Sequence, residues 1–196
     1  MKLIIGSICL VLFAVLAVGI RRPAIKQLDA QVTEKVVSIR QPALNTLMFF
    51  FTQLGRFSGV LVVMIALALI PGFWRGVVWP AAISLTVSWW VAFALKRLLK
   101  RPRPEGQRLT EEEDHSFPSF HATCSAALSL SVVLGGTACY PQLTGWFVVA
   151  AVGIAGMIGF SRIYLGIHFL TDILGGWLFG TGITLLVWAA FQSIVK

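Results

Sequence analysis

The chain has 196 residues, of which 57% are hydrophobic and only 12% are charged, and its mean hydropathy is +0.84. Soluble domains carry about 25% charged residues, so this composition excludes a soluble globular protein and indicates an integral membrane protein. The net charge of +8 suits anionic lipid headgroups, and nothing beyond that generic attraction indicates a nucleic-acid partner. At this length we expect residues 1–196 to form a single domain.

Six apolar runs without charged residues predict the membrane spans, because a helix needs about 20 apolar residues to cross the hydrocarbon core. In chain order the runs are residues 3–20, 57–73, 76–95, 122–139, 143–160 and 173–195. The short link before the third run contains Arg75, which predicts a tight helical hairpin between the second and third spans. The predicted fold is therefore all-α, an integral membrane bundle of six transmembrane helices.

The segment between the first two runs is amphipathic. Apolar residues recur at helical spacing at positions 25, 28, 32, 36 and 39, and charged residues, among them Lys26, Asp29 and Glu34, occupy other positions. This pattern predicts an interfacial helix that lies on the membrane. The apolar stretch from Pro42 to Leu54 is interrupted by polar residues, and we expect a re-entrant or interfacial segment there.

Polar clusters lie at four of the predicted span ends. They are Lys96 with Arg103 and Pro104 after the third span, Pro118-Ser119-Phe120-His121 at the start of the fourth, Ser161-Arg162 at the end of the fifth, and His168 with Asp172 at the start of the sixth. Because the spans alternate in direction, all four ends face the same side of the membrane. The sequence therefore predicts one site at a membrane interface.

The clusters supply the groups that phosphoryl transfer through a histidine requires. One imidazole attacks the phosphorus, a second protonates the departing oxygen, and cations hold the non-bridging oxygens. Asp172 follows His168 by four residues, so on a helix its carboxylate can accept from one ring nitrogen and leave the other free to attack. We therefore predict that His168 is the nucleophile and that His121 stands beside the bound phosphate.

The start of the fourth span is the predicted phosphate-binding end of a helix. Ser116 and Pro118 resemble an N-cap and an early helical proline, so the amides of Ser119 and Phe120 would point outward from the positive helix end. The cations expected to stabilise a pentacoordinate phosphorus are Lys96, Arg103 and Arg162.

Other polar residues receive a structural interpretation. A lone basic residue at a span end is usually an anchor, and this is the interpretation given to Arg97, Lys100 and Arg101. The acidic run 111–114 is interpreted as a solvated loop without a chemical role, which favours the following helix through its dipole. No metal or disulfide spacing is evident, so neither a metal site nor another cofactor is expected.

The motifs Lys-x6-Arg-Pro (96–104), Pro-Ser-x-His (118–121) and Ser-Arg-x5-His-x3-Asp (161–172) resemble the three-part signature of the type 2 phosphatidic acid phosphatase superfamily. The resemblance implies a six-helix bundle and a metal-independent phosphatase mechanism, with His168 as nucleophile and His121 as general acid. The phosphate ligands that it implies are Lys96, Arg103, Ser119 and Arg162. Phe120 stands where the family usually has glycine, and we expect its amide to bind phosphate and its ring to crowd the mouth of the site.

The predicted function is hydrolysis of a lipid phosphomonoester or diphosphate that enters from the bilayer, such as undecaprenyl diphosphate, phosphatidylglycerophosphate or phosphatidic acid. The alternative is a membrane transporter or anion-binding protein with a cationic vestibule at the interface. Transporter sites usually lie near the bilayer midplane, whereas these residues cluster at span ends. The sequence leaves the choice of lipid and the oligomeric state open.

The orientation of the site rests on two opposing arguments. All but three of the 16 Lys and Arg residues, namely Lys2, Arg75 and Lys196, fall on the side of the site. The positive-inside rule would therefore place the site in the cytoplasm. The family resemblance implies the opposite, and we expect a multi-pass protein of the cell (inner or plasma) membrane with its site on the extracytoplasmic face.

Overall fold

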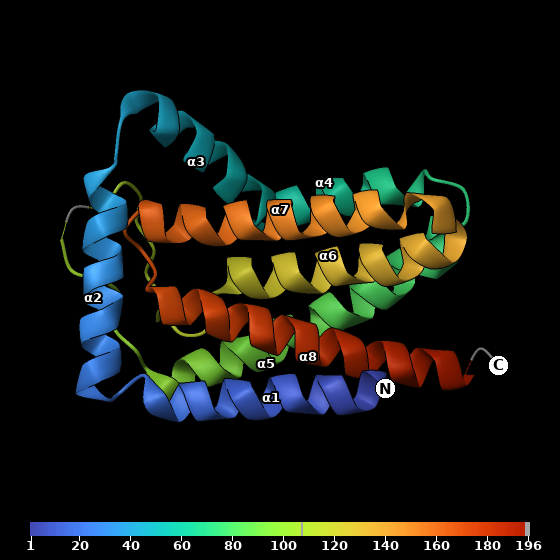
Figure 1. Ribbon diagram of the computed structural model, residues 1–196, viewed down its shortest axis with the longest axis horizontal. Helices are drawn as coiled ribbons and strands as arrows, with labels where there is room; N and C mark the ends of the chain where they lie inside the picture. The colour runs from blue at the N-terminus through green and yellow to red at the C-terminus, as the bar shows by residue number, and fades with distance from the viewer. Residues whose placement is uncertain (107, 195–196) are drawn as a thin grey trace.

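The computed structural model describes residues 1–106 and 108–194, and every regular element in these residues is a helix. The eight α-helices are α1 (Lys2–Gly19), α2 (Pro23–Ser38), α3 (Pro42–Leu54), α4 (Phe57–Ala68), α5 (Trp79–Leu99), α6 (Phe120–Cys139), α7 (Thr144–Tyr164) and α8 (Leu170–Ile194). The long helices α1, α5, α6, α7 and α8 run side by side, and α2 lies across one end of them (Figure 1). The all-α membrane bundle predicted from hydropathy is confirmed.

Five helical segments of the described chain are long and apolar enough to span a membrane, and a sixth span results if α3 and α4 are counted together. These two helices meet at a bend of 67°. The predicted second span, residues 57–73, is shorter than expected, because α4 has 12 residues and ends at Ala68. At 1.5 Å per residue α4 alone reaches about 18 Å, well short of a hydrocarbon core of about 30 Å. Residues 57–73 therefore do not form the predicted straight span, and only α3 and α4 together are long enough to cross.

The boundaries of other predicted spans also change, most clearly in the third and the last. Arg75 lies within a π-helical turn, Trp74–Val78, that leads directly into α5, so it belongs to the third span and not to the link before it. The last helix begins at Leu170, three residues earlier than predicted. Val195, the predicted end of that span, lies outside the described residues.

Helices α6 and α8 pack with their backbones close together. A Cβ atom added at Gly180 of α8 would lie 2.4 Å from the carbonyl oxygen of Thr123 in α6, and one at Gly176 would lie 2.7 Å from the Cβ of Ala122. Only glycine permits this approach, as is common where membrane helices cross. The close contact sets the start of α6 beside the start of α8, where the predicted catalytic residues lie.

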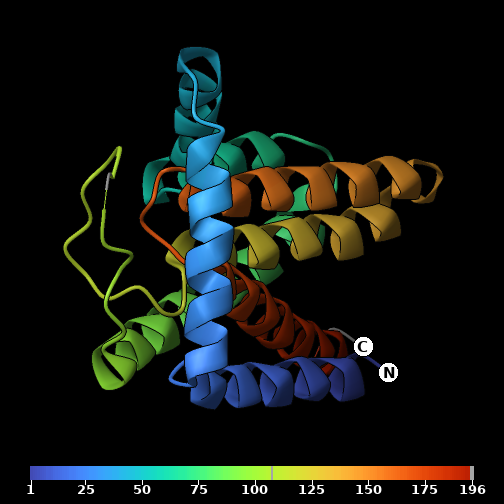
Figure 2. The ribbon, with the colours of Figure 1, turned by 60° about the vertical axis from the view of Figure 1, so that its left-hand side comes forward.

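The amphipathic helix α2 covers the end of the bundle at which α5 and α7 end and α6 and α8 begin (Figures 1 and 2). Its position agrees with the predicted interfacial helix. One residue departs from the expected pattern: Asp29, which the sequence placed among the charged positions, is fully buried against the bundle. The connection from α5 to α6 loops out beside α2 at the same end (Figure 2).

Candidate active site

All the residues predicted for the site gather at the end of the bundle that α2 covers. Lys96 lies in the last turn of α5, Arg162 in the last turn of α7, and Asp172 in the first turn of α8. His121 is the second residue of α6, and His168 lies in the turn between α7 and α8. Each is at least nine-tenths buried. The convergence of span ends therefore brings together side chains that are up to 76 residues apart in the sequence, from Lys96 to Asp172.

The two ring nitrogens of His168 have different partners. Nδ1 lies 3.4 Å from Oδ2 of Asp172, which also accepts a hydrogen bond of 2.8 Å from the amide of Phe169. Nε2 lies 3.2 Å from a terminal nitrogen of Arg103. Because arginine only donates, this contact assigns the lone pair to Nε2 and the proton to Nδ1. The imidazole therefore directs a nucleophilic nitrogen toward a cation.

The surroundings of His168 favour its neutral form. Burial, and then the positive charges of Arg103, Arg162 and Lys96, hold the pKa of His168 well below its usual value of 6.5. The ring is therefore unprotonated at neutral pH, which the predicted role of nucleophile requires.

The acidic run 111–114 is a largely exposed loop, as the sequence predicted, but two of its carboxylates pair with cations of the site. Asp114 accepts from both Lys96, at 2.7 Å, and Arg103. Glu112 accepts at 2.6 Å from Arg162. The loop between α5 and α6 thus brings its carboxylates onto all three cations that were predicted to bind phosphate.

Asp114 is ionised in this position. Burial alone would raise the pKa of its carboxyl, but the charges and hydrogen bonds of Lys96 and Arg103 outweigh that effect and hold the pKa below its usual value. Main-chain carbonyls also hold these two cations, since Lys96 donates to the carbonyl of His115 and Arg103 to those of Asp114 and Ile167.

The start of α6 differs from the expected arrangement. The N-cap is Ser119, whose hydroxyl accepts from the amide of Ala122 at 3.5 Å, and not Ser116. The amide of Ser119 donates to the carbonyl of Asp172 at 3.1 Å, so the expectation that it points outward for phosphate is wrong. Ser116 instead binds the carbonyls of Arg101 and Pro102 and fixes the chain after α5. The first amides of α6, beginning with Phe120, have no acceptor within the helix.

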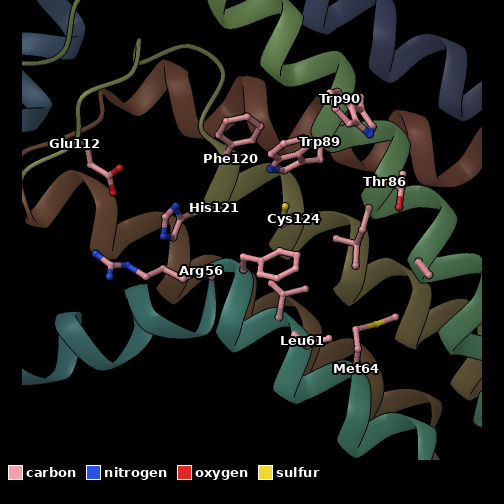
Figure 3. A pocket seen from close by; sticks show the side chains of 15 residues that line it. Arg56, Leu61, Met64, Thr86, Trp89, Trp90, Glu112, Phe120, His121 and Cys124 are labelled. Atoms are coloured by element: carbon pink, nitrogen blue, oxygen red, sulfur yellow. The ribbon is translucent and has the colours of Figure 1, made fainter.

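A cavity of about 680 Å³ opens beside the cationic cluster between α4, α5 and α6. Figure 3 shows Arg56, Glu112 and His121 grouped at one side of this cavity, while side chains such as Leu61 and Met64 line the other. Nε2 of His121 is buried and has no hydrogen-bond partner among the described residues. One end of the cavity is therefore polar, with an imidazole nitrogen that lacks a hydrogen-bond partner among the described residues, and the rest of the cavity is apolar.

The ring of Phe120 borders the cavity and also contacts Lys96. It stacks on Trp89 at a centroid distance of 6.1 Å and lies 4.8 Å from the ammonium nitrogen of Lys96. Phe120 also lines the cavity (Figure 3).

The sequence interpretation missed Arg101 and Asp29. Arg101, taken as an anchor, is 8% exposed and donates to Asp172 at 2.6 Å and to Asp29 at 2.6 Å. The inward position of Asp29 could have been predicted, because position 29 lies at helical spacing from the apolar positions 25, 32 and 36. Arg101 stands in a basic run that gives no comparable indication. In the described part of the chain, no group of three or more His, Cys, Asp or Glu side chains is placed to hold a metal ion.

Comparison with known proteins identifies the family. The family model of the PAP2 superfamily matches residues 77–196. Phosphatidylglycerophosphatase B of Bacillus subtilis (strain 168) is 32% identical over 191 residues, which cover 94% of this chain and 93% of that protein. Undecaprenyl-diphosphatase of Sulfolobus acidocaldarius is 28% identical over 171 residues, which cover 82% of this chain and 74% of the relative.

The fold is also similar to a solved structure. The crystal structure of a transmembrane PAP2-type phosphatidylglycerolphosphate phosphatase from Bacillus subtilis matches with a TM-score of 0.88 and 29% identity, over 97% of each chain. All three sequence motifs, from Lys96 to Asp172, lie within the region that the family model matches. The transporter alternative is therefore set aside. The chain belongs to the PAP2 superfamily and is a multi-pass membrane lipid phosphatase.

Proposed function

We propose that the site cleaves a lipid phosphate in two steps through a phosphohistidine on His168. Nε2 of His168 attacks the phosphorus, the bond to the lipid oxygen breaks, and His121 gives a proton to that oxygen. Water then attacks the phosphohistidine while His121 removes a proton from it, the phosphorus–nitrogen bond breaks, and inorganic phosphate leaves. The supporting observation is the asymmetry of His168, with Asp172 on Nδ1 and the Arg103 guanidinium on Nε2.

The phosphate is proposed to bind where the loop carboxylates now lie. A carboxylate and a phosphate offer the same kind of charged oxygen to a guanidinium or ammonium group, so Glu112 and Asp114 mark positions for phosphate oxygens. Nε of Arg162 is buried without a partner among the described residues, which leaves a donor for a ligand. The proposed phosphate ligands are the side chains of Lys96, Arg103 and Arg162 and the amide of Phe120. Ser119 is proposed to bind phosphate through its hydroxyl, because its amide donates to the carbonyl of Asp172.

The apolar cavity is the proposed place of the lipid chain next to the scissile bond. Its polar side carries His121, where a phosphate ester would meet the catalytic groups, and its apolar side extends along α4 and α5 (Figure 3). We propose a lipid of the phosphatidylglycerophosphate or phosphatidic acid class as the first substrate to test, because a relative that covers 94% of this chain is a phosphatidylglycerophosphatase. Undecaprenyl diphosphate is the second substrate to test, supported by the relative from Sulfolobus acidocaldarius.

Release of inorganic phosphate from purified lipid phosphates tests this proposal. Detergent-solubilised protein should release phosphate from at least one of phosphatidylglycerophosphate, phosphatidic acid and undecaprenyl diphosphate, and His168→Ala should release none. Undiminished turnover by His168→Ala would remove His168 as the nucleophile. Turnover of water-soluble phosphates alone would remove the lipid cavity from the proposal.

The site is proposed to face the extracytoplasmic side of the cell membrane, on the strength of the family resemblance. The first turn of α1 and the last turn of α8 lie at the end of the bundle opposite α2 (Figure 1), so a reporter fused to the C-terminus probes the opposite face from the site. A cytoplasmic reporter should be active there. An active alkaline phosphatase fusion at the same place would reverse the orientation.

A further inference from the structure

Asp172 uses its two oxygens for different partners. Oδ2 faces Nδ1 of His168 at 3.4 Å, and Oδ1 accepts a hydrogen bond of 2.6 Å from a terminal nitrogen of Arg101. Asp172 is fully buried and Arg101 is 8% exposed. The carboxylate that orients the nucleophile is therefore itself held by a buried guanidinium.

Arg101 is in turn held by the interfacial helix. Its other terminal nitrogen donates to Asp29 of α2 at 2.6 Å, and the nitrogen that binds Asp172 also donates to the hydroxyl of Thr171 at 2.7 Å. Thr171 closes the network, because its hydroxyl donates to Asp29 at 2.6 Å and its amide does so at 3.0 Å. Asp29 is fully buried.

The charges of this network alternate from α2 to the nucleophile: Asp29, Arg101, Asp172 and then the imidazole of His168. A single guanidinium against Asp172 would cancel the carboxylate charge, whereas the second carboxylate of Asp29 leaves one net negative charge beside the ring. Phosphorylation of Nε2 while Nδ1 keeps its proton makes the imidazole cationic. A net negative neighbour in a buried site stabilises that cation.

We propose that Arg101 and Asp29 are positioning residues for His168, which act through Asp172 to fix the imidazole and to stabilise its phosphorylated form. The inference rests on the proposed phosphohistidine mechanism and extends it to a helix outside the sequence motifs. On this proposal α2 contributes one residue, Asp29, to the network that positions the nucleophile.

Arg101 is placed apart from the phosphate ligands. Both of its terminal nitrogens are engaged with carboxylates, and the ring of Phe169 lies 4.5 Å from its guanidinium carbon. It approaches the carboxylate on Nδ1 of His168, whereas Arg103 approaches Nε2. Loss of Arg101 or Asp29 should therefore change turnover and leave the affinity for lipid phosphate nearly unchanged.

Steady-state kinetics of Arg101→Lys and Asp29→Asn test the proposal in the full-length protein in detergent. Both variants should lower kcat by about 10- to 100-fold, as small displacements of a catalytic group do. The KM should stay within about twofold, because no phosphate ligand is removed. The matched control is Arg97→Met, which removes an exposed positive charge four residues earlier and should keep wild-type kinetics.

A second measurement separates positioning from a structural role. In an Asp172→Asn background, Arg101→Lys should lower kcat by less than about threefold further, because the residue through which it acts is already altered. Full additivity of the two changes would overturn the proposal. A raised KM with unchanged kcat would do the same, since it would make Arg101 a phosphate ligand.

Folding is followed by thermal unfolding and gel filtration of each variant, because removing one partner of a buried ion pair is destabilising. If Arg101→Lys does not fold, Asp29→Asn carries the test, since it keeps the shape of the side chain. Failure of both to fold would make the network structural and refute the proposal. If wild-type protein forms no phosphohistidine, the proposed function fails, whereas wild-type kcat in both variants refutes only this inference.

Discussion

The loop carboxylates should compete with phosphate for the cations of the site. Asp114 contacts Lys96 and Arg103, and Glu112 contacts Arg162. Substrate must displace these contacts before its phosphate can bind. Asp114→Asn and Glu112→Gln should therefore tighten the binding of phosphate, which is the opposite of what loss of a substrate ligand would do.

The size of the effect follows from the exposure of the carboxylates. The side chain of Asp114 is 44% exposed and that of Glu112 is 25% exposed, so each pair is partly screened by solvent. Ion pairs near the surface contribute about 0.2 to 1 kcal/mol, which corresponds to a change in affinity of about 1.5- to 5-fold for each substitution. Lys96 and Arg103 should stay in place, because carbonyl groups also hold them.

The assay is competitive inhibition of lipid phosphate hydrolysis by inorganic phosphate, with the inhibition constant falling in both variants. Glu111→Gln and Glu113→Gln are matched controls, because they remove the same charge from exposed positions in the same loop. The low pKa of Asp114 keeps its carboxylate ionised from pH 5 to 9, so the effect should persist across this range. An equal fall in the control variants, or weaker inhibition in Asp114→Asn, would refute the reasoning.

Three further predictions concern the catalytic groups. Burial among cations keeps the pKa of His168 well below 6.5, so as the pH falls the unfolded chain takes up a proton there before the folded protein does. The free energy of unfolding should therefore decrease as the pH drops below about 6.5. The acid limb of kcat/KM should also lie below that value, and a limb at or above 6.5 would contradict the prediction. Arg162→Lys should lose about tenfold or more in turnover, because a lysine cannot reproduce a fork that spans Thr52 and Glu112 at 2.6 Å each, and near-normal turnover would remove the guanidinium from the site. His121→Ala should retain a larger fraction of wild-type activity toward nitrophenyl phosphate than toward a lipid phosphate, and it should accumulate phosphohistidine. Covalent phosphate found on His121 of the wild type by mass spectrometry would reverse the roles of nucleophile and general acid.

Hydropathy was sufficient to predict five spans and the end of the bundle where the polar residues of the candidate site gather. Each span is a local property of about 20 residues, and alternation of the spans then places Lys96, His121, Arg162 and His168 on one side. The pairing of His168 with Asp172 was also local, because the two lie four residues apart. The bend between α3 and α4 was missed, since a broken apolar stretch can be interfacial or part of a bent span.

The contacts that only the tertiary structure decided join segments far apart in the chain. Asp29 reaches Arg101 because α2 lies across the bundle with that residue turned inward, and Glu112 reaches Arg162 because the long loop folds back over the site. Local apolar spacing places position 29 on the buried face of α2, but it determines neither the partner of Asp29 nor the path of a loop. Both depend on which buried charges find partners once the helices have packed. The sequence by itself therefore determined which polar groups gather at one end of the bundle, and the tertiary structure determined which charges hold them.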